Sequence, residues 1–198
     1  WNGSTWSALG SGMDSTVRAL AVSGTDLYAG GDFTTAGGAS ANYIAKWNGS
    51  AWSALGAGMN STVNALAVSG TDLYAGGIFT TVGGVSANYI AKWNGITWSA
   101  LGSGMNFTVN ALVVSGTDLY AGGDFTTAGG VAANRIAKWN GSAWSALGSG
   151  MNSGVSALAV IGPDLYAGGG FTTAGGVSVN RIAKWNGSTW SALGSGMD

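Results

Sequence analysis

The sequence predicts an all-β protein, a β-propeller of four-stranded antiparallel blades, and three observations lead to this fold class. Tryptophan recurs every 46 residues, at Trp1, Trp47, Trp93, Trp139 and Trp185. Within each unit, short apolar and β-branched segments alternate with Gly-rich turns, and no segment shows helical periodicity. Units of about 40 to 50 residues with four strands are typical of propeller blades, which stack face to face around an axis.

The repeat organises the chain as one repeat domain, residues 1–198. The complete units are residues 1–46, 47–92, 93–138 and 139–184, and residues 185–198 are the start of a fifth unit. The letters WNGSTWSALGSGMD therefore both open and close the chain. One strand type occurs five times and the others four times, so the sequence contains four repeats plus one surplus terminal strand.

The four strands of a unit are predicted from the first copy. Residues 16–23 are apolar and β-branched, and a short Gly-containing turn joins them to residues 27–34 as a hairpin. A Gly-Gly loop precedes the third strand, residues 43–47. Asn48 and Gly49 then favour a type I′ turn into the fourth strand, which corresponds to residues 5–10 of the first copy.

A single blade of this kind has apolar residues on both faces, so the blades are expected to stack on one another. Ala19 and Ala21 are small enough for the innermost strand, where blades crowd together near the axis. The bulky residues expected to fill the wider space between blades are Trp6, Leu27, Tyr28, Phe33, Ile44 and Trp47. Burial of these rings and aliphatic side chains is the expected source of stability.

The composition excludes several classes of function. The chain has 7 Lys and Arg, 8 acidic residues, all Asp, and a net charge of −1, so it has no basic surface for nucleic acid. It has no His, no Cys and no Glu, which excludes a Ser-His-Asp triad, a Cys-His pair and the usual zinc sites. We therefore expect no enzymatic activity, no cofactor and no metal. No apolar run approaches the roughly 18 residues of a membrane span, so membrane insertion is not expected.

The charged residues that remain recur at fixed positions. Asp26 and its equivalents follow the Gly of a hairpin turn, where we interpret them as acceptors for nearby backbone amides. Lys46 and its equivalents precede a Trp and are expected to pair with the repeated Asp or to cross an indole face. Asp32 and Asp124 occupy a position that holds other residue types elsewhere, so they are expected to face solvent or a mouth of the ring.

Carbohydrate binding is the alternative function for this repeat, because exposed Trp faces stack on sugar rings and nearby Asn and Asp bind hydroxyl groups. A ring of equal weak sites would gain avidity. The competing interpretation is a core Trp followed by a structural turn. The candidate ligand-binding residues are Trp47, Asn48, Trp93, Asn94, Trp139, Asn140, Asp32 and Asp124.

The surplus strand suggests association with other copies of the chain. Only one of the two terminal copies can complete the last blade, and an open strand edge is a pairing hazard. The surplus copy could instead augment a blade of a second chain, giving a homo-oligomer, a larger ring or a fibre. The residues assigned to this strand are Trp6, Leu9, Trp190 and Leu193.

The segment LYAGGDFTTAGGASANYIAKWNG, residues 27–49, with the following W-x-x-L-G, resembles Kelch-like β-propeller repeats of the Rax2 type. That resemblance covers the whole chain and implies a propeller of bacterial or fungal secreted or cell-surface proteins. Its matched residues are framework, so it implies no catalytic residue. The near-perfect repetition departs from natural members and leaves a designed or consensus origin open. We therefore predict a non-enzymatic, extracellular or surface-displayed structural or interaction scaffold.

Overall fold

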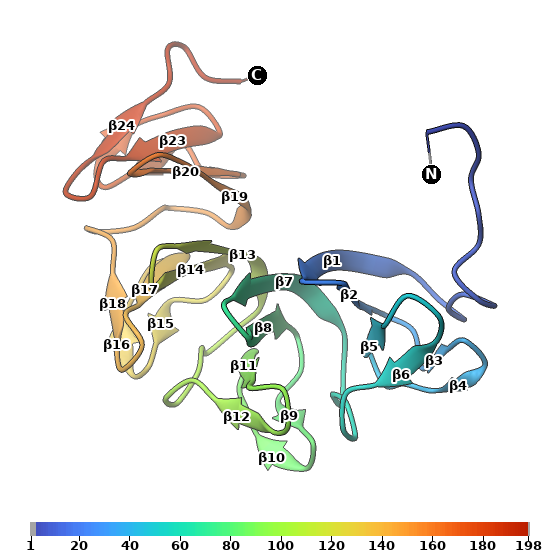
Figure 1. Cartoon of the computed structure of the whole chain (residues 1–198). Coiled ribbons are helices and arrows are strands. Elements are labelled where there is room, and N and C mark those ends of the chain that lie inside the picture. The colour runs from blue at the N-terminus through green and yellow to red at the C-terminus, as the bar shows by residue number, and fades with distance from the viewer. Residues whose placement is uncertain (1–2, 198) are drawn as a thin grey trace.

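A computed structural model describes residues 3–197 and shows four blades arranged as an open arc (Figure 1). The described residues form 24 strands and no helix. Each blade is a four-stranded antiparallel sheet, so the all-β propeller fold and its 46-residue repeat are confirmed. A short two-stranded hairpin accompanies each blade, on the connection between its second and third strands.

The first two blades have the following strands. The first blade contains β1 (Val17–Ser23), β2 (Asp26–Gly31), β5 (Ile44–Trp47) and β6 (Trp52–Ala54), with the hairpin β3 (Thr35–Ala36) and β4 (Ala39–Ser40). The second contains β7 (Val63–Ser69), β8 (Asp72–Gly77), β11 (Ile90–Trp93) and β12 (Trp98–Ala100), with the hairpin β9 (Thr81–Val82) and β10 (Val85–Ser86).

The last two blades repeat this order. The third blade contains β13 (Val109–Ser115), β14 (Asp118–Gly123), β17 (Ile136–Trp139) and β18 (Trp144–Ala146), with the hairpin β15 (Thr127–Ala128) and β16 (Val131–Ala132). The fourth contains β19 (Val155–Ile161), β20 (Asp164–Gly169), β23 (Ile182–Trp185) and β24 (Trp190–Ala192), with the hairpin β21 (Thr173–Ala174) and β22 (Val177–Ser178).

The strand boundaries differ slightly from the sequence predictions. The second strand of the first blade ends at Gly31 and not at Thr34, and the outer strand has only three residues. The turn before the outer strand also differs from the prediction. A type I′ turn with Asn48 and Gly49 at its centre needs positive φ at both residues, but φ is positive at Gly49 (96°) and not at Asn48. The observed turn has Gly49 as the first of its two central residues, and positive φ at that residue alone is the pattern of a type II′ turn, so the predicted type I′ turn was wrong.

Side chains of successive blades pack together between the sheets, as the sequence predicted. In the space between the first two blades, Tyr28 and Ile44 of the first blade pack in one cluster with Leu73, Phe79 and Trp98 of the second. Phe79 and its equivalents in the other blades are completely buried. The Trp98 Nε1–H donates a hydrogen bond to the carbonyl of Leu55, 3.0 Å away. Stacking of neighbouring blades therefore adds apolar burial to that within each blade.

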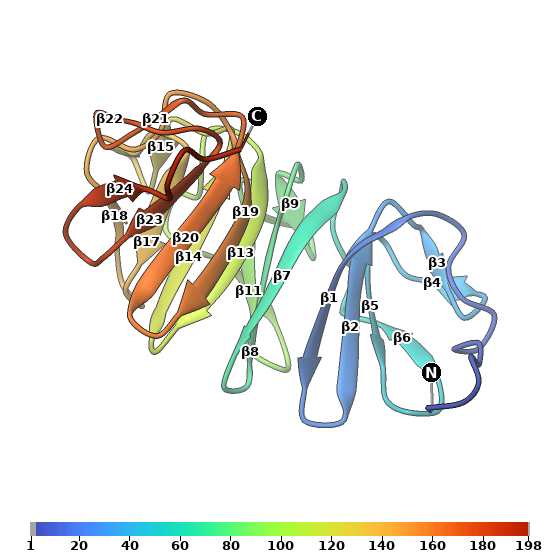
Figure 2. The same cartoon turned by 90° about the horizontal axis from the view of Figure 1, so that it is seen from above.

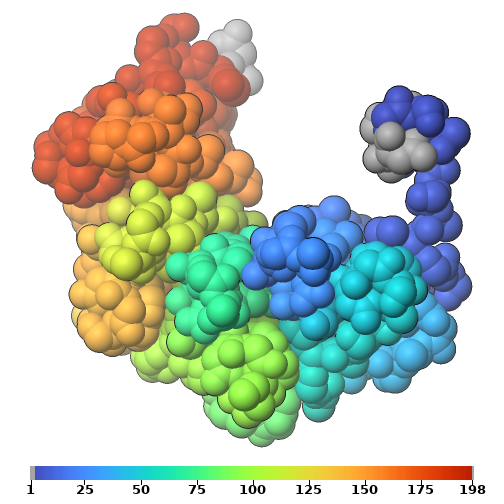
Figure 3. Space-filling model, in the orientation of Figure 1, coloured from blue at the N-terminus to red at the C-terminus, as the bar shows by residue number. Residues whose placement is uncertain are grey.

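The first strands of the four blades, β1, β7, β13 and β19, lie side by side along the inner edge of the arc (Figures 1 and 2). Ala65, Ala67 and Ala111 are buried there, as expected for small residues on the innermost strand. The arc does not close into a ring, because the first and the fourth blade are separated by an opening (Figure 3). Two blade faces therefore lie at the ends of the arc without a following or preceding blade.

Candidate functional site

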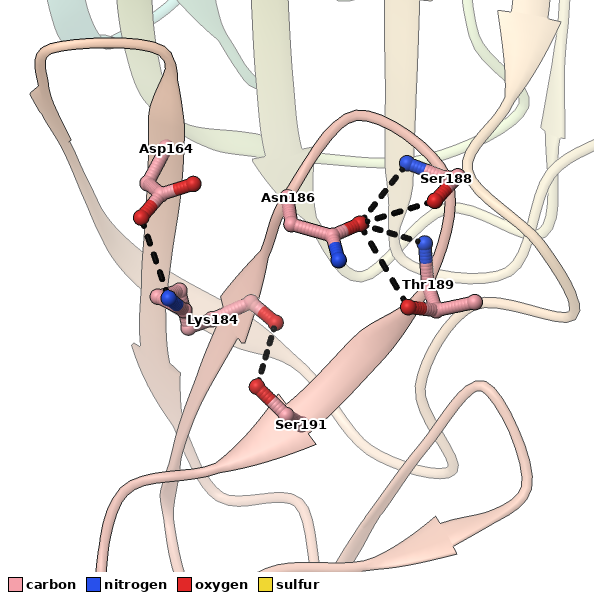
Figure 4. A network of polar contacts seen from close by, with 6 residues as sticks. All are labelled: Asp164, Lys184, Asn186, Ser188, Thr189 and Ser191. Atoms are coloured by element: carbon pink, nitrogen blue, oxygen red, sulfur yellow. Dashed lines mark hydrogen bonds and ion pairs between the residues drawn. The ribbon is translucent and has the colours of Figure 1, made fainter.

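The repeated Lys and Asp residues form ion pairs within each blade. In the fourth blade, Lys184 Nζ lies 3.0 Å from Asp164 Oδ2, across the paired strands β20 and β23 (Figure 4). The hydrogen bond with Asp164 raises the pKa of Lys184 above its usual value. The other three blades have the same pair at 3.0 or 3.1 Å. The predicted pairing is confirmed, whereas the interpretation of the Asp as an acceptor for turn amides was wrong.

The Trp and Asn residues predicted to bind carbohydrate have structural contacts. The half-buried Trp47 packs against Trp52 with ring centroids 5.5 Å apart. The Asn48 Oδ1 accepts hydrogen bonds from the backbone N–H of Ser50 (3.0 Å) and Ala51 (2.9 Å), as the corresponding Asn186 does in Figure 4. The equivalent residues Trp93, Asn94, Trp139 and Asn140 have the same contacts.

One shallow groove lies beside such a Trp pair. Trp93, Trp98, Val82, Val85 and Ile96 are among the residues that line it, and its volume is about 310 Å³. Its lining is mainly apolar, and the Asn94 side chain is engaged in its own turn. Because sugar binding needs polar groups placed beside the aromatic face, this groove adds no support for carbohydrate binding, which stays a prediction.

Asp32 and Asp124 are held by neighbouring side chains rather than aimed at a common point. Arg18 forms an ion pair with Asp32 at 2.7 Å, and the Thr62 hydroxyl donates to Asp32 from the second blade at 2.8 Å. The Arg18 hydrogen bond, followed by that of Thr62, lowers the pKa of Asp32. Asp124 accepts a hydrogen bond from Asn110 at 2.9 Å. Among residues 3–197, no three acidic, His or Cys side chains are grouped as metal ligands.

The face of the first blade at the open end of the arc is apolar and exposed. We call it the head face and define it by Leu9, Met13, Val17, Leu20, Leu27 and Trp52, which line a hollow of about 270 Å³. The same surface of the second blade is covered by the first blade. Leu20 is 61% exposed whereas the equivalent Leu66 is 8% exposed, and Val17 is 39% exposed whereas Val63 is fully buried.

The fourth blade ends the arc with the opposite face. We call this the tail face and define it by Ala157, Ala159, Tyr166, Gly168 and Ile182, which line a hollow of about 170 Å³. In the first blade, the equivalent Tyr28 and Ile44 are buried against the second blade. The tail face therefore presents residues that pack against a following blade wherever one exists.

The glycine that recurs in the second strand of each blade shows most directly that no neighbouring blade covers the tail face. A Cβ added at Gly76 would lie 2.5 Å from Val109 Cγ1 of the next blade, and Gly30 and Gly122 are equally close to the corresponding Val. A Cβ at Gly168 would meet nothing nearer than 3.9 Å. The glycine at this position allows close approach of a neighbouring blade, and at Gly168 the place for that Val is open.

The terminal copies of the outer strand have different positions. Trp190 lies in β24 and is buried, so the fourth blade is completed by the C-terminal copy, and Leu193 follows directly. Residues 5–9 of the N-terminal copy form no strand, and Trp6 is 83% exposed while Leu9 lines the head face. The surplus copy is therefore the N-terminal one.

Sequence reasoning assigned self-association to a strand edge and missed the two end faces. The residues concerned, such as Val17, Leu20, Gly168 and Ile182, have the same or similar neighbours in sequence as their buried equivalents. The signal that could have found them is the number of units, because an arc of few blades must leave the first and last face uncovered.

Comparisons with known proteins show the fold. No family model and no curated protein matches the sequence. Among solved structures, the chain is similar to the computationally designed Ika4 protein, with a TM-score of 0.60 and 18% identity over 91% of this chain and 98% of that chain. It is also similar to the RRP9 WD40 repeats, with a TM-score of 0.64 and 15% identity over 91% of this chain and 51% of that chain.

The WD40 β-propeller domain of Doa1 matches in the same way, with a TM-score of 0.61 and 13% identity over 94% of this chain and 57% of that chain. The chain thus spans about half the length of the WD40 chains that it matches. At these identities the likeness concerns the fold alone, which is a propeller of repeated four-stranded blades. Within residues 3–197 there is no helix with the length and apolar character needed to cross a membrane.

Proposed function

We propose that this chain is a non-enzymatic structural and interaction scaffold that associates with further copies of itself. The observation that carries this proposal is the exposure of apolar head and tail faces whose equivalents are buried or partly buried at the internal junctions. Contiguous exposed apolar surface on a soluble protein marks an interaction site. The repeated polar side chains support a scaffold role, because they are engaged in bonds that hold the blades.

The native mass of the full chain tests this function. Sedimentation velocity at micromolar concentration is expected to show a species heavier than the 19.5 kDa single chain. A single-chain mass over the whole concentration range would contradict self-association. Catalytic turnover of a substrate would contradict the scaffold role.

Strand exchange is the route to self-association that the sequence suggested, and a truncated chain tests it. Removal of residues 1–8 deletes Trp6 and most of this strand but leaves all four described blades, including β24, and the head-face residues Leu9 and Met13. If the N-terminal strand inserts into another chain, the truncated protein should no longer associate. If the end faces provide the association, the truncated protein should retain most of it.

We also propose that the scaffold is secreted or displayed at a cell surface, as the similarity to Rax2-type Kelch-like repeats implies. Fractionation of producing cells, with the protein followed by antibody, tests this location. Recovery in the cytosolic fraction alone would contradict it. Carbohydrate binding is tested separately on a glycan array, where a Trp47→Ala variant that remains folded should lose any signal due to the Trp faces.

A further inference from the structure

The head face and the tail face correspond to the two opposing sides of an internal blade junction. This complementarity identifies a second copy of the chain as the partner. At an internal junction, the face with Gly76, Tyr74 and Ile90 packs on the next blade at Val109 and Leu112. The tail face has the first set in Gly168, Tyr166 and Ile182, and the head face has the second set in Val17 and Leu20. A chain thus exposes both members of a junction that it forms three times internally.

We propose that two copies of this chain join head to tail at both ends and close one ring of eight blades. This inference rests on the proposed self-association and specifies its partner and geometry. A head-to-tail contact joins different surfaces, so it closes a ring only if the curvature of the arc permits. The curvature is that of a propeller, because the arc superposes on WD40 propellers over 91% and 94% of its length with TM-scores of 0.64 and 0.61.

The fourth blade carries a further apolar residue on the side of the tail face. Ile161 is 67% exposed, whereas the same position holds Ser23, Ser69 and Ser115 in the other copies. Side chains two residues apart lie on one face of a strand, so Ile161 shares a face with Ala157 and Ala159 of the tail face. The copy that ends the arc thus extends the apolar tail face.

The terminal segments also fit one shared position at such a junction. At the internal junction, residues 55–60 bind both blades: the Met59 N–H donates to the Asn42 carbonyl, and Asn60 Oδ1 accepts from the N–H groups of Thr80 and Thr81. At the ends of the chain, the C-terminal segment makes one of these two sets of contacts and the N-terminal segment makes the other. The Met197 N–H donates to the Asn180 carbonyl on the fourth blade.

The N-terminal copy makes the other half of the contacts. Asp14 accepts hydrogen bonds from Thr34 and Thr35 on the first blade, as Asn60 does on the second. When the head face of one chain joins the tail face of another, either the N-terminal or the C-terminal segment at that junction can make both sets of contacts. The other segment then becomes redundant. We therefore expect the ring to tolerate removal of residues 1–14 or of residues 193–198, but to weaken when both are removed.

Two variants block the two faces separately. Gly168→Val places a branched side chain where the partner's Val17 must fit, while it has open space within its own chain. Leu20→Asp places a charge on the head face at a residue that is already exposed. Matched controls are Ile96→Val and Ile96→Asp, a branched and a charged substitution on an exposed outer loop that lies in neither end face.

Sedimentation velocity of these proteins tests the inference. The wild type should have the mass of two chains, without larger species at higher concentration. Each blocked variant should dimerise about 100-fold or more weakly, because both junctions of the ring carry the substitution. The controls should behave as the wild type. An equimolar mixture of the two blocked variants should form a heterodimer, because one intact tail face still meets one intact head face.

The remaining outcomes overturn the inference. A Gly168→Val protein that dimerises normally would show that the tail face is not used, and a mixture that stays monomeric would exclude a head-to-tail junction. Wild-type species that grow beyond two chains would exclude a closed ring while leaving self-association intact. A monomeric wild type would contradict the proposed function itself. Circular dichroism of each variant confirms that the strands are retained.

Discussion

Substitution of alanine for Gly76 should destabilise the protein, whereas the same substitution at Gly168 should not. The Cβ that Gly76→Ala introduces would lie 2.5 Å from Val109 Cγ1 and 3.0 Å from Val109 Cβ. Carbon atoms pack at about 3.5 to 4.0 Å, so the two blades would have to separate by about 1 Å at this point. Val109 is fully buried.

The size of the effect follows from two opposing contributions. Overpacking a filled core costs about 1 to 3 kcal/mol. Replacing Gly by Ala in a strand gains about 0.5 to 1 kcal/mol, because the unfolded chain loses conformational freedom. Gly76→Ala should therefore lower the free energy of unfolding by up to about 2.5 kcal/mol, with a middle value of about 1 kcal/mol. Gly168→Ala meets nothing closer than 3.9 Å and should raise it by a few tenths of a kcal/mol or more.

Urea unfolding followed by tryptophan fluorescence measures both variants, at a concentration low enough that the chains are not associated. Because repeat proteins can unfold in parts, hydrogen exchange of the β8 and β20 amides should be measured as well. The two variants are matched in residue type, strand and position within the blade. Equal effects, or a larger loss for Gly168→Ala, would refute the view that close approach of the next blade requires this glycine.

Three further predictions concern contacts that recur in the blades. Trp98→Phe should lower the free energy of unfolding by about 1 kcal/mol or slightly more, since it removes the Nε1–H hydrogen bond to Leu55 and part of a buried ring; an unchanged urea midpoint would contradict this. The hydrogen bond that Asp14 accepts from the Thr35 amide is the main cause that lowers the pKa of Asp14 to about 2. The ionised Asp14 carboxylate should therefore stabilise the folded protein fully above about pH 4, and this stabilisation should disappear as the pH falls from about 4 towards 2. Carboxyl NMR titration measures this pKa, and an Asp14→Asn variant should lack this pH dependence. Lys92→Met should change stability by less than about 1 kcal/mol, because its ion pair is partly exposed, and the small effect should decrease further in high salt.

The sequence was sufficient to predict the strands, the blades and their stacking, because period-two apolar segments and Gly-containing turns recur in each unit. It was less successful where side-chain geometry decides the contact. Asp26 follows a hairpin Gly, which favours an amide-binding turn, whereas Lys46 was expected either to pair with this Asp or to cross an indole face. The structure shows the pair between Asp26 and Lys46 on the adjacent strand. The local pattern shows that both residues are polar and does not show that β2 and β5 bring them within 3.0 Å.

The end faces show a different limit of sequence reasoning. Val17 and Val63 are the same residue in nearly the same local sequence, and one is 39% exposed while the other is buried. No propensity or period distinguishes them, because the difference lies in whether another described blade packs on that face. Only the position of the unit within the arc reveals it. The candidate site is therefore a property of the number and curvature of the blades and not of a local motif.

Two chains should prefer a closed ring over a growing fibre. Inside the chain a junction forms between linked blades, whereas a junction between two chains must offset an association cost of about 4 to 15 kcal/mol. In a linear assembly each added chain bears that cost for one junction. In a ring of two chains one such cost is shared by two junctions, and closure of the second is intramolecular. Because the junction surfaces are equivalent throughout, the ring should be the preferred assembly wherever the curvature of the arc allows closure.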